Sequence, residues 1–127
     1  DAVLGPPGSG AWASAGGGTR TYQTYTKVND ETGEVYSGRT SGTGTPAQNV
    51  ARRDSGHDKT AEGFGPAKLD KSSSNKDAIR GREQQLVDAN GGAKSSGGTS
   101  GNKINAIAPN NQNRGKYMDA AKKEFGQ

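Results

Sequence analysis

The stretch Thr24–Gly42, TYTKVNDETGEVYSGRTSG, decides the fold that we expect for this chain. It contains two runs of β-branched and aromatic residues on either side of residues 30–33, DETG. Such runs around an Asx/Gly loop are typical of a β-hairpin. One tyrosine stands in each run, Tyr25 in the first and Tyr36 in the second. The hairpin therefore predicts two phenol groups in one neighbourhood.

Composition limits the chain to one small domain. At 127 residues, with 27% hydrophobic residues and 21 glycines, it has little material for a core, so we expect thin layers and long loops. A mean hydropathy of −1.02 is also typical of disordered chains, but the tyrosines and valines of the hairpin indicate that the middle folds. No cysteine is present, which excludes disulfides, thiolate metal sites and thiol nucleophiles. No membrane segment is expected, since no apolar run approaches the ~20 residues that span a bilayer.

Residues 1–20, DAVLGPPGSGAWASAGGGTR, predict a flexible linker or arm. They are rich in glycine and proline and show no hydrophobic periodicity. Trp12 is the one anchor in this arm, and we expect it to dock on a surface groove. The chain begins without methionine, which suits a fragment of a larger protein and equally a tag remnant or a processed terminus. Residues 21–127 then form the folded domain.

The first predicted helix has two start signals after the hairpin. Thr45 is a suitable N-cap and Pro46 occupies the first helical position. We expect the helix to run to about Asp54, where a Ser-Gly pair interrupts or ends it. One more turn across this glycine would place Arg53 and His57, at positions i and i+4, on one helix face.

A second helix is predicted over Ala78–Ala89, whose isoleucine, leucine and valine form an apolar stripe. Its cap is Ser74 or Asn75, and an Asn-Gly-Gly sequence marks its end. Glu83 lies near the middle of this helix. A glutamate there is by default a solvent-facing helix former, so interest in Glu83 comes from the residues that accompany it.

Two further elements complete the predicted fold. Asn102–Asn105, followed by Ile107, has an extended apolar rhythm that predicts a third strand. A terminal helix carries Tyr117, Ala121 and Phe125 at i, i+4 and i+8, which is typical of a core-facing stripe. We therefore predict an α+β fold with a small three-stranded antiparallel sheet flanked by helices.

The two tyrosine motifs and the residues after them resemble the GIY-YIG nuclease family. The second motif is residues 36–40, YSGRT, and the first is residues 24–26, TYT, without the family's leading glycine. The family has an arginine on its first helix, often with a histidine or tyrosine one turn later, and a metal-binding glutamate on a later helix. Arg53, His57 and Glu83 stand in that order.

This resemblance covers roughly residues 22–105 and implies a metal-dependent endonuclease. It implies that Glu83 binds Mg²⁺ or Mn²⁺, that Tyr25 acts as general base and that Arg53 holds the non-bridging oxygens of the phosphate. The other two residues would orient water and phosphate or share the proton transfer. The expected catalytic residues are thus Tyr25, Tyr36, Arg53, His57 and Glu83, with Glu83 as the metal ligand.

The charge of the chain suits a polyanionic partner. A net charge of +4 comes from 17 basic and 13 acidic residues, and the basic ones are interleaved with the proposed site. We expect DNA as the substrate, with RNA open, and low sequence specificity because no base-reading motif is visible. The residues expected to bind substrate are Arg39, Arg52, Lys59 and Arg82, to which the resemblance adds Asn102, near the point where the family has an asparagine.

A glycine-rich start before a compact, basic, cysteine-free nuclease resembles the C-terminal toxin domain of bacterial polymorphic toxins of the rearrangement-hotspot type. That context implies an effector that is secreted or delivered into the cytoplasm of a target cell and a cognate immunity protein as partner. Two other functions stay open on the sequence, a noncatalytic nucleic-acid-binding module and an ADP-ribosyltransferase toxin. For the latter, Arg39, Thr40-Ser41 and Glu83 are available, but the usual Glu-x-Glu or Gln-x-Glu is missing.

Overall fold

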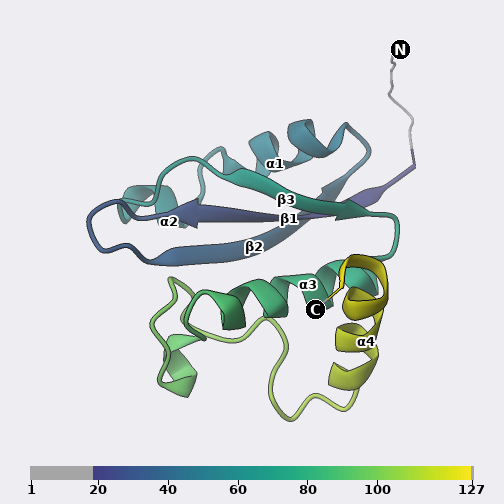
Figure 1. Ribbon diagram of the computed structural model, residues 1–127. Coiled ribbons are helices and arrows are strands. Elements are labelled where there is room, and N and C mark those ends of the chain that lie inside the picture. Colours follow the sequence, from purple (N-terminus) through teal and green to yellow (C-terminus); the bar gives the residue numbers. More distant parts are fainter. Residues whose placement is uncertain (1–18, 127) are drawn as a thin grey trace.

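The computed structural model describes residues 19–126 and has an α+β fold (Figure 1). Its sheet has the strand order β2-β1-β3, and both neighbouring pairs are antiparallel. The strands are β1 (Thr21–Val28), β2 (Val35–Gly42) and β3 (Lys68–Ser73). The predicted class, with a three-stranded antiparallel sheet and flanking helices, is confirmed.

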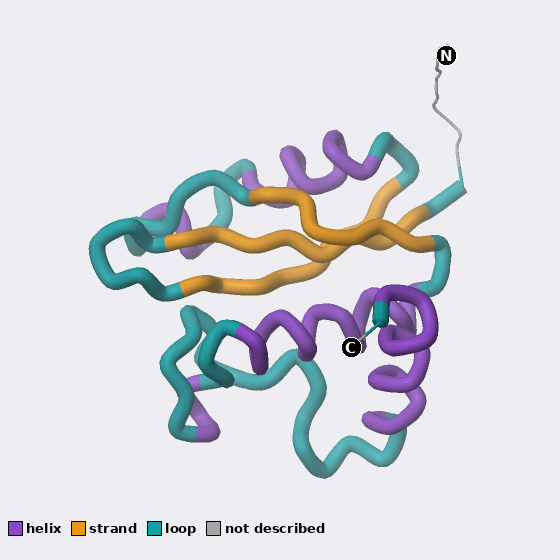
Figure 2. Tube along the Cα trace, viewed as in Figure 1, coloured by secondary structure: helices purple, strands orange, loops and turns teal. Residues whose placement is uncertain are grey.

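Helices cover both faces of this sheet (Figure 2). They are α1 (Pro46–Asp54), α2 (Asp58–Ala61), α3 (Lys76–Ala89) and α4 (Arg114–Phe125), with a short 3₁₀ helix η1 (Lys94–Ser96). Helix α1 contacts all three strands from one side, and α3 contacts all three from the other. Helix α4 packs on α3.

The β1–β2 hairpin forms where the sequence predicts it. The side chain of Asn29 closes the turn, since its Oδ1 accepts from the backbone N–H groups of Glu31 at 3.0 Å and Thr32 at 3.2 Å. The register then places Tyr25 opposite Gly38 in the neighbouring strand. The first tyrosine of the pattern therefore faces the glycine of the second motif.

The third strand is β3, and the prediction of a strand at Asn102–Ile107 was wrong. Strand β3 carries one large hydrophobic residue, Leu69, which is 43% exposed, and it pairs along the free edge of β1. The 102–107 segment is a loop that other groups hold in place. The Asn102 amide bonds to both backbone groups of Ser37, at 2.9 Å and 2.8 Å, and the N–H of Ile107 donates to Gln84 Oε1 at 2.9 Å.

A bulge in β3 anchors α3 to the sheet. The pairing shifts between Thr24 and Tyr25 of β1, which leaves Asp70 as the extra residue on β3. The Asp70 carboxylate accepts from Thr24 Oγ1 at 2.7 Å and from Arg82 Nε and Nη2 at 2.8 Å and 3.0 Å. This bidentate pair fixes α3 one residue before Glu83, so the bulge helps to position that carboxylate.

Helix α1 begins at its predicted cap and ends at Asp54, and the turn at Gly56 breaks it. His57 does not continue the helix. It caps α2, with its Nδ1 accepting from the backbone N–H of Lys59 at 3.1 Å. The prediction that Arg53 and His57 share one helix face was therefore wrong, because the glycine ends the helix before the second residue is reached.

The core is small and mixes apolar with polar side chains. Fully buried residues include Tyr25, Ile79, Val87, Ile107 and Ala121, together with the hydrogen-bonded Gln23, Lys27, Asn49 and Gln84. Where α3 crosses α4, the Cβ of any residue other than glycine at position 81 would clash with the backbone carbonyl of Tyr117. That close approach seals the core on the α3 side.

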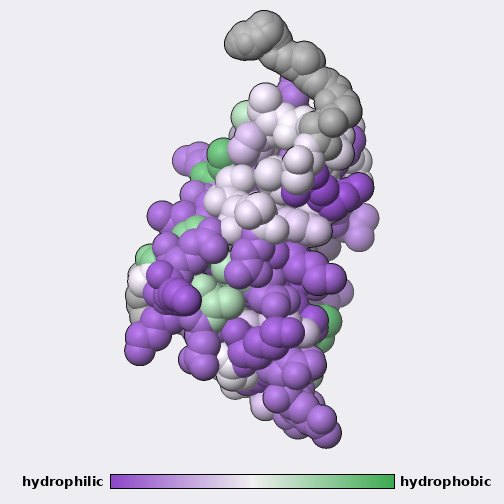
Figure 3. Space-filling model, turned by 90° about the vertical axis from the view of Figure 1, so that its right-hand side faces the viewer, coloured by the Kyte–Doolittle hydropathy of each residue, from purple (hydrophilic) through white to green (hydrophobic). Residues whose placement is uncertain are grey.

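On the face shown in Figure 3, hydrophilic residues predominate and hydrophobic residues form small separate groups. Over the described part of the chain, no helix combines the length and apolar character needed to cross a bilayer. The predicted arm over residues 1–20, with Trp12, lies outside the described residues apart from Thr19 and Arg20.

Candidate active site

Three aromatic side chains from separate segments meet at one end of the sheet. The ring centroids of Tyr25 and Tyr36 are 6.4 Å apart. The imidazole centroid of His57 lies 5.9 Å from that of Tyr25 and 5.3 Å from that of Tyr36. Tyr25 is 1% exposed and His57 5% exposed, whereas Tyr36 is half-buried and lines a cleft. The hairpin and the α1–α2 turn thus bring together three of the predicted catalytic residues.

The hydrogen bonds of His57 fix its role toward Tyr25. Because Nδ1 accepts from the Lys59 N–H, the neutral ring carries its hydrogen on Nε2, which donates to Tyr25 Oη at 2.9 Å. Burial lowers the pKa of His57 below its ordinary value, and the charges of Arg53 and Lys27 lower it further. The imidazole is therefore a neutral donor to the phenol oxygen.

Gly38 makes room for the Tyr25 hydroxyl. A Cβ atom at position 38 would lie 2.5 Å from Cζ and 2.5 Å from Oη of Tyr25, closer than van der Waals contact allows. The ring of Tyr25 therefore crosses β2 at the one position in that motif that has no side chain. The glycine of the second tyrosine motif thus has a steric role in the first tyrosine's placement.

A buried ion pair holds the turn that carries His57. The ammonium of Lys27, on β1, is fully buried and bonds to Asp54 Oδ1 and to Thr60 Oγ1, the latter at 3.0 Å. The hydrogen bond from Lys27 lowers the pKa of Asp54, whose other oxygen accepts from the N–H of Ala67 at 3.2 Å. These contacts join β1, the end of α1 and α2 around the imidazole. Sequence reasoning missed the pair, although Lys27 shares its β1 face with Tyr25.

Glu83 is a buried carboxylate with an unusual pKa. Its side chain is 12% exposed, and its Oε1 lies 3.5 Å from Arg39 Nε. Burial raises its pKa to about 7, although the charges of Arg39 and Arg80 act in the opposite direction. The carboxyl group is therefore poised to change charge near neutral pH, which is common for residues at functional sites.

Tyr36 and Glu83 face the same cleft. This cleft has a volume of about 390 Å³, and five of the predicted site residues line it, namely Tyr36, Arg39, Lys59, Glu83 and Asn102. Lys59 pairs with Glu62 at 3.2 Å and lies 5.6 Å from the ring centroid of Tyr36. The cleft therefore combines a phenol with three carboxyl groups (Asp58, Glu62 and Glu83) and three cations (Arg39, Lys59 and Lys103).

The charge of Arg53 acts on the whole aromatic cluster. Burial raises the pKa of Tyr25, with the other phenol adding to the rise, and burial followed by the charge of Glu83 raises the pKa of Tyr36. Arg53, which is exposed, acts in the opposite direction on both tyrosines. Both phenols are protonated near neutral pH in the free protein, and Arg53 favours their ionised forms.

All five predicted substrate-binding residues contact protein groups. Arg39 and Lys59 form ion pairs with Glu83 and Glu62, and the other three are held by hydrogen bonds. Arg52 Nη2 donates to the carbonyl of Ser41 at 2.7 Å, and Arg82 is bound by Asp70. Asn102 lines the cleft, but its amide is occupied by Ser37. These contacts give the three side chains positioning roles, and Arg39 and Lys59 are the predicted substrate-binding residues with charges in the cleft.

A divalent cation fits the donor chemistry of Glu83. In the described residues, no group of three or more His, Asp or Glu side chains is arranged to hold a metal ion. Mg²⁺ does not require such a cage, because it is commonly held by one or two carboxylates together with water and substrate phosphates. Glu83 supplies one hard oxygen ligand at the cleft, which suits Mg²⁺ or Mn²⁺ with the remaining positions taken by water and phosphate.

Tyr36 and Glu83 line a cleft that also carries cations, and Tyr25 and His57 pack beside Tyr36. In comparisons with known proteins, no family model, no curated protein and no solved structure matches this chain.

Proposed function

We propose that this chain is a metal-dependent endonuclease of the GIY-YIG type that hydrolyses DNA phosphodiester bonds with low sequence specificity. One observation carries the proposal. Tyr36 of β2, Lys59 of α2 and Glu83 of α3 line one cleft, with Tyr25 and His57 packed beside Tyr36. The sequence resemblance concerned only the order of these residues along the chain, so their meeting in space is separate support.

The tyrosine pair is the proposed general base. Tyr36 lines the cleft, where its hydroxyl can contact a water molecule, and Tyr25 lies beside it in a buried position. Each phenol affects the pKa of the other, so they titrate as a pair. One phenol first releases its proton to solvent through the cleft that Tyr36 lines, and the phenolate then accepts a proton from the attacking water. The donor hydrogen bond from His57 and the charge of Arg53 stabilise that ionised form.

Hydrolysis then follows as an in-line displacement. The hydroxide oxygen forms a bond to phosphorus, the bond from phosphorus to the leaving oxygen breaks, and the leaving oxygen takes up a proton from solvent. The products are one terminal phosphate and one hydroxyl group. Arg39, Lys59 and Arg53 supply positive charge for the pentavalent phosphorus. A cation held by Glu83 would stabilise negative charge on the leaving oxygen.

Incubation of supercoiled plasmid with the protein and Mg²⁺ tests this proposal, with Glu83→Gln as the matched variant. We expect nicking and linearisation by the wild type, none by the variant, and none in excess EDTA. A folded RNA under the same conditions establishes the preference between nucleic acids. Binding without cleavage would indicate a noncatalytic nucleic-acid-binding module instead. Transfer of label from NAD to a protein substrate would indicate an ADP-ribosyltransferase.

We also propose that the domain is a toxin, secreted or delivered into the cytoplasm of a target bacterium and restrained by a cognate immunity protein. Its support is the sequence context, a glycine-rich start before a basic domain without cysteine. Expressed in a bacterial cytoplasm, the wild type should degrade chromosomal DNA and stop growth, and Glu83→Gln should not. Normal growth at a level of wild-type protein that cleaves plasmid in the lysate would contradict this proposal.

A further inference from the structure

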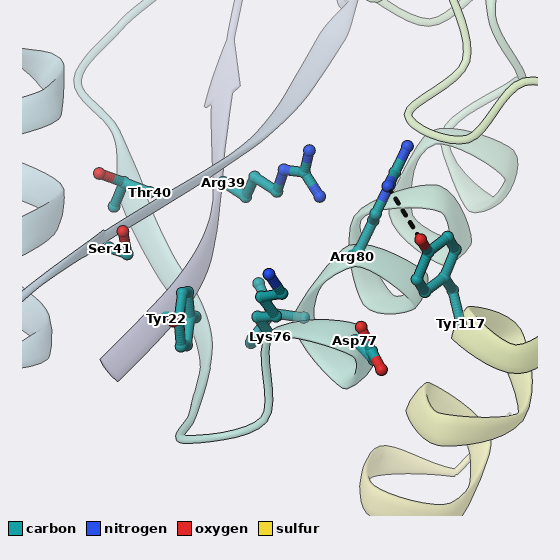
Figure 4. Close-up of a pocket in the computed structure, with 9 residues that line it drawn as sticks. Tyr22, Arg39, Thr40, Ser41, Lys76, Asp77, Arg80 and Tyr117 are labelled. Carbon is teal, nitrogen blue, oxygen red and sulfur yellow. Dashed lines mark hydrogen bonds between the residues drawn. The ribbon is translucent and has the colours of Figure 1, made fainter. Parts of the chain in front are cut away.

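A second cleft lies beside the candidate active site, between the sheet and the first turns of α3 (Figure 4). It has a volume of about 370 Å³ and is lined by Tyr22 of β1, Arg39 of β2, Lys76 and Arg80 of α3 and Tyr117 of α4, among others. Arg39 also lines the cleft that contains Glu83, so the two clefts meet at this arginine. Apart from Arg39, the proposed chemistry uses none of these side chains.

Two cations in the second cleft have no acidic partner in the described part of the chain. Neither Lys76 nor Arg80 forms an ion pair there, whereas Asp77 is paired with Lys116 at 3.5 Å. Arg80 Nη1 donates to Tyr117 Oη at 3.2 Å, and the guanidinium lies 4.6 Å from that ring centroid. The buried Arg80 Nε has no hydrogen-bond partner among the described residues. A buried donor without an acceptor is costly, and a ligand in the cleft would relieve that cost.

Arg39 and Arg80 direct their charges into the same region. In Figure 4, Arg39 extends from β2 toward Arg80, which rises from α3. Both arginines also lie near Glu83, since Arg39 Nε is 3.5 Å from its Oε1 and Arg80 precedes it by one turn of α3. Two guanidinium groups that converge from different elements repel each other, and an anion between them removes that repulsion.

We propose that the second cleft binds the sugar-phosphate backbone of the substrate strand next to the scissile bond, with Arg80 and Lys76 contacting a phosphate and Tyr22 packing against the adjacent deoxyribose. The proposal rests on the proposed nuclease function, which places the scissile phosphate at Glu83. Arg80 precedes Glu83 by one helical turn, a separation of about 5–6 Å between Cβ atoms. Phosphates of one strand advance about 3.4 Å along the helix axis per nucleotide. A phosphate at Arg80 is therefore one or two nucleotides from the bond that is cut.

The test measures binding of a fluorescein-labelled duplex oligonucleotide as a function of salt, in the Glu83→Gln background so that the substrate stays intact. Removal of one phosphate contact lowers the slope of log K against log salt by about one. We expect this loss for Arg80→Ala and for Lys76→Ala. Tyr22→Ala should weaken binding at an unchanged slope, because a contact with an uncharged sugar releases no counterion. Lys123→Ala, which removes an exposed lysine outside the cleft, is the control.

The outcomes separate this proposal from the proposed function. Suppose that the wild type cleaves plasmid and the Glu83→Gln protein binds DNA. If the cleft variants then show the same slopes and affinities as the control, the second-cleft proposal is overturned and the proposed nuclease function stands. A wild type that neither binds nor cleaves nucleic acid would overturn both. Because Arg80 packs on Tyr117, its variant is checked by thermal melting. Lys76 is exposed, so its variant decides the question if Arg80→Ala fails to fold.

Discussion

Tyr25 Oη and His57 Nε2 lie 2.9 Å apart in a buried contact in which the imidazole is the donor. This direction matters for the chemistry. A neutral His57 with its hydrogen on Nε2 cannot take the proton of Tyr25, so it is not a base for the phenol. It stabilises the phenolate instead, as a hydrogen bond to the charged form does in general. The ionisation of the tyrosine pair therefore depends on the charges around it.

Activity should rise with pH through the titration of Glu83. The carboxyl group has a pKa of about 7 because it is buried, and only its ionised form can bind a cation. At a fixed subsaturating Mg²⁺ concentration, kcat/KM for plasmid nicking should increase as pH rises from 5.5 to 8. Roughly 1 in 30 of the Glu83 carboxyl groups is ionised at pH 5.5, and most are ionised at pH 8. Raising Mg²⁺ should move the midpoint to lower pH. A profile that is flat over this range, at every Mg²⁺ concentration, would argue against Glu83 as the ligand.

The same carboxyl group should make the fold less stable at high pH. Its pKa is about 7 in the folded chain against an ordinary value of 4.5, so the folded protein binds this proton more tightly than the unfolded chain. The free energy of unfolding therefore falls as pH rises from about 4.5 to about 7 and is level above that range. The full effect is on the order of 3 kcal/mol. Glu83→Gln should remove this loss.

Urea unfolding of the wild type and of Glu83→Gln at pH 5 and pH 8 measures the effect. The difference between the two proteins isolates Glu83, because His57 titrates in both. We expect the free energy of unfolding of Glu83→Gln, minus that of the wild type, to be larger at pH 8 than at pH 5. An equal difference at both pH values would show that the carboxyl group titrates normally.

The local parts of this fold are predictable from the sequence because their signals are local. The hairpin depends on Asn29 and the turn after it, and α1 depends on the predicted Thr45 cap, which forms a capping box with Gln48. Asn75 likewise caps α3, accepting from two backbone N–H groups. Each of these contacts joins residues at most a few positions apart, so no knowledge of the tertiary structure is required.

The third strand depends on distant pairing and could not be predicted in this way. The sequence of β3, KLDKSS, has little β propensity, and it forms a strand because the edge of β1 is available to it. The isoleucines at 104 and 107 are three positions apart, which would place them on opposite faces of a strand, and in the structure only Ile107 is buried while Ile104 is exposed. Burial of the Asn102 and Gln84 amides holds that segment as a loop, and such amide contacts leave no periodic signal.

Most of the candidate site follows from the order of residues, but its geometry does not. The predicted helical pairing of Arg53 with His57 fails at Gly56, and the imidazole reaches Tyr25 through the α2 cap instead. The glycine was visible in the sequence as a helix end. The ion pair between Lys27 and Asp54 that fixes this turn was not visible, because only the packing of α1 on the sheet brings these two side chains together.

Arg53→Ala should lower activity much more than Arg52→Ala. Arg53 is exposed and its charge favours ionisation of both tyrosines, so its loss should reduce kcat on the order of 10²-fold with little change in the melting temperature. Arg52 bonds to the Ser41 carbonyl, so its loss should lower the melting temperature and leave kcat nearly unchanged. Arg53→Lys keeps a charge and should restore part of the rate. If both alanine variants lose the same amount of activity, both arginines only attract the phosphate backbone through their charge.

Gly38→Ala should displace the Tyr25 hydroxyl. The new methyl group would overlap Cζ and Oη, so either the ring moves away from His57 or β2 shifts. Overpacking of this kind typically costs about 1–3 kcal/mol, and we expect at least a tenfold loss in kcat as well. Gly115→Ala is the matched control, because a Cβ at that position in α4 meets no other atom. Full activity of Gly38→Ala would show that the phenol position is not critical.

The two hairpin tyrosines test the central proposal. Tyr→Phe removes only the hydroxyl and keeps the ring area that packs in the hairpin. A general base contributes roughly 10²- to 10⁴-fold to the rate, so Tyr25→Phe and Tyr36→Phe should each lower kcat by at least 10²-fold. Tyr25→Phe should also lower stability by about 1–3 kcal/mol, because it leaves the buried His57 Nε2–H without its acceptor. Tyr36 is half-buried and forms no such bond with His57, so its variant should melt close to the wild type.

Thr26→Val is the control for loss of a hydroxyl on β1, since it keeps the shape of the side chain on the face opposite to Tyr25. It should change neither kcat nor the melting temperature appreciably. The two measurements then separate chemistry from packing, because Tyr36→Phe loses rate without stability and Tyr25→Phe loses both. If Tyr36→Phe keeps full nuclease activity, the cleft-facing hydroxyl does not contact the attacking water. If both variants keep it, the tyrosines serve packing alone and the proposed general base is wrong.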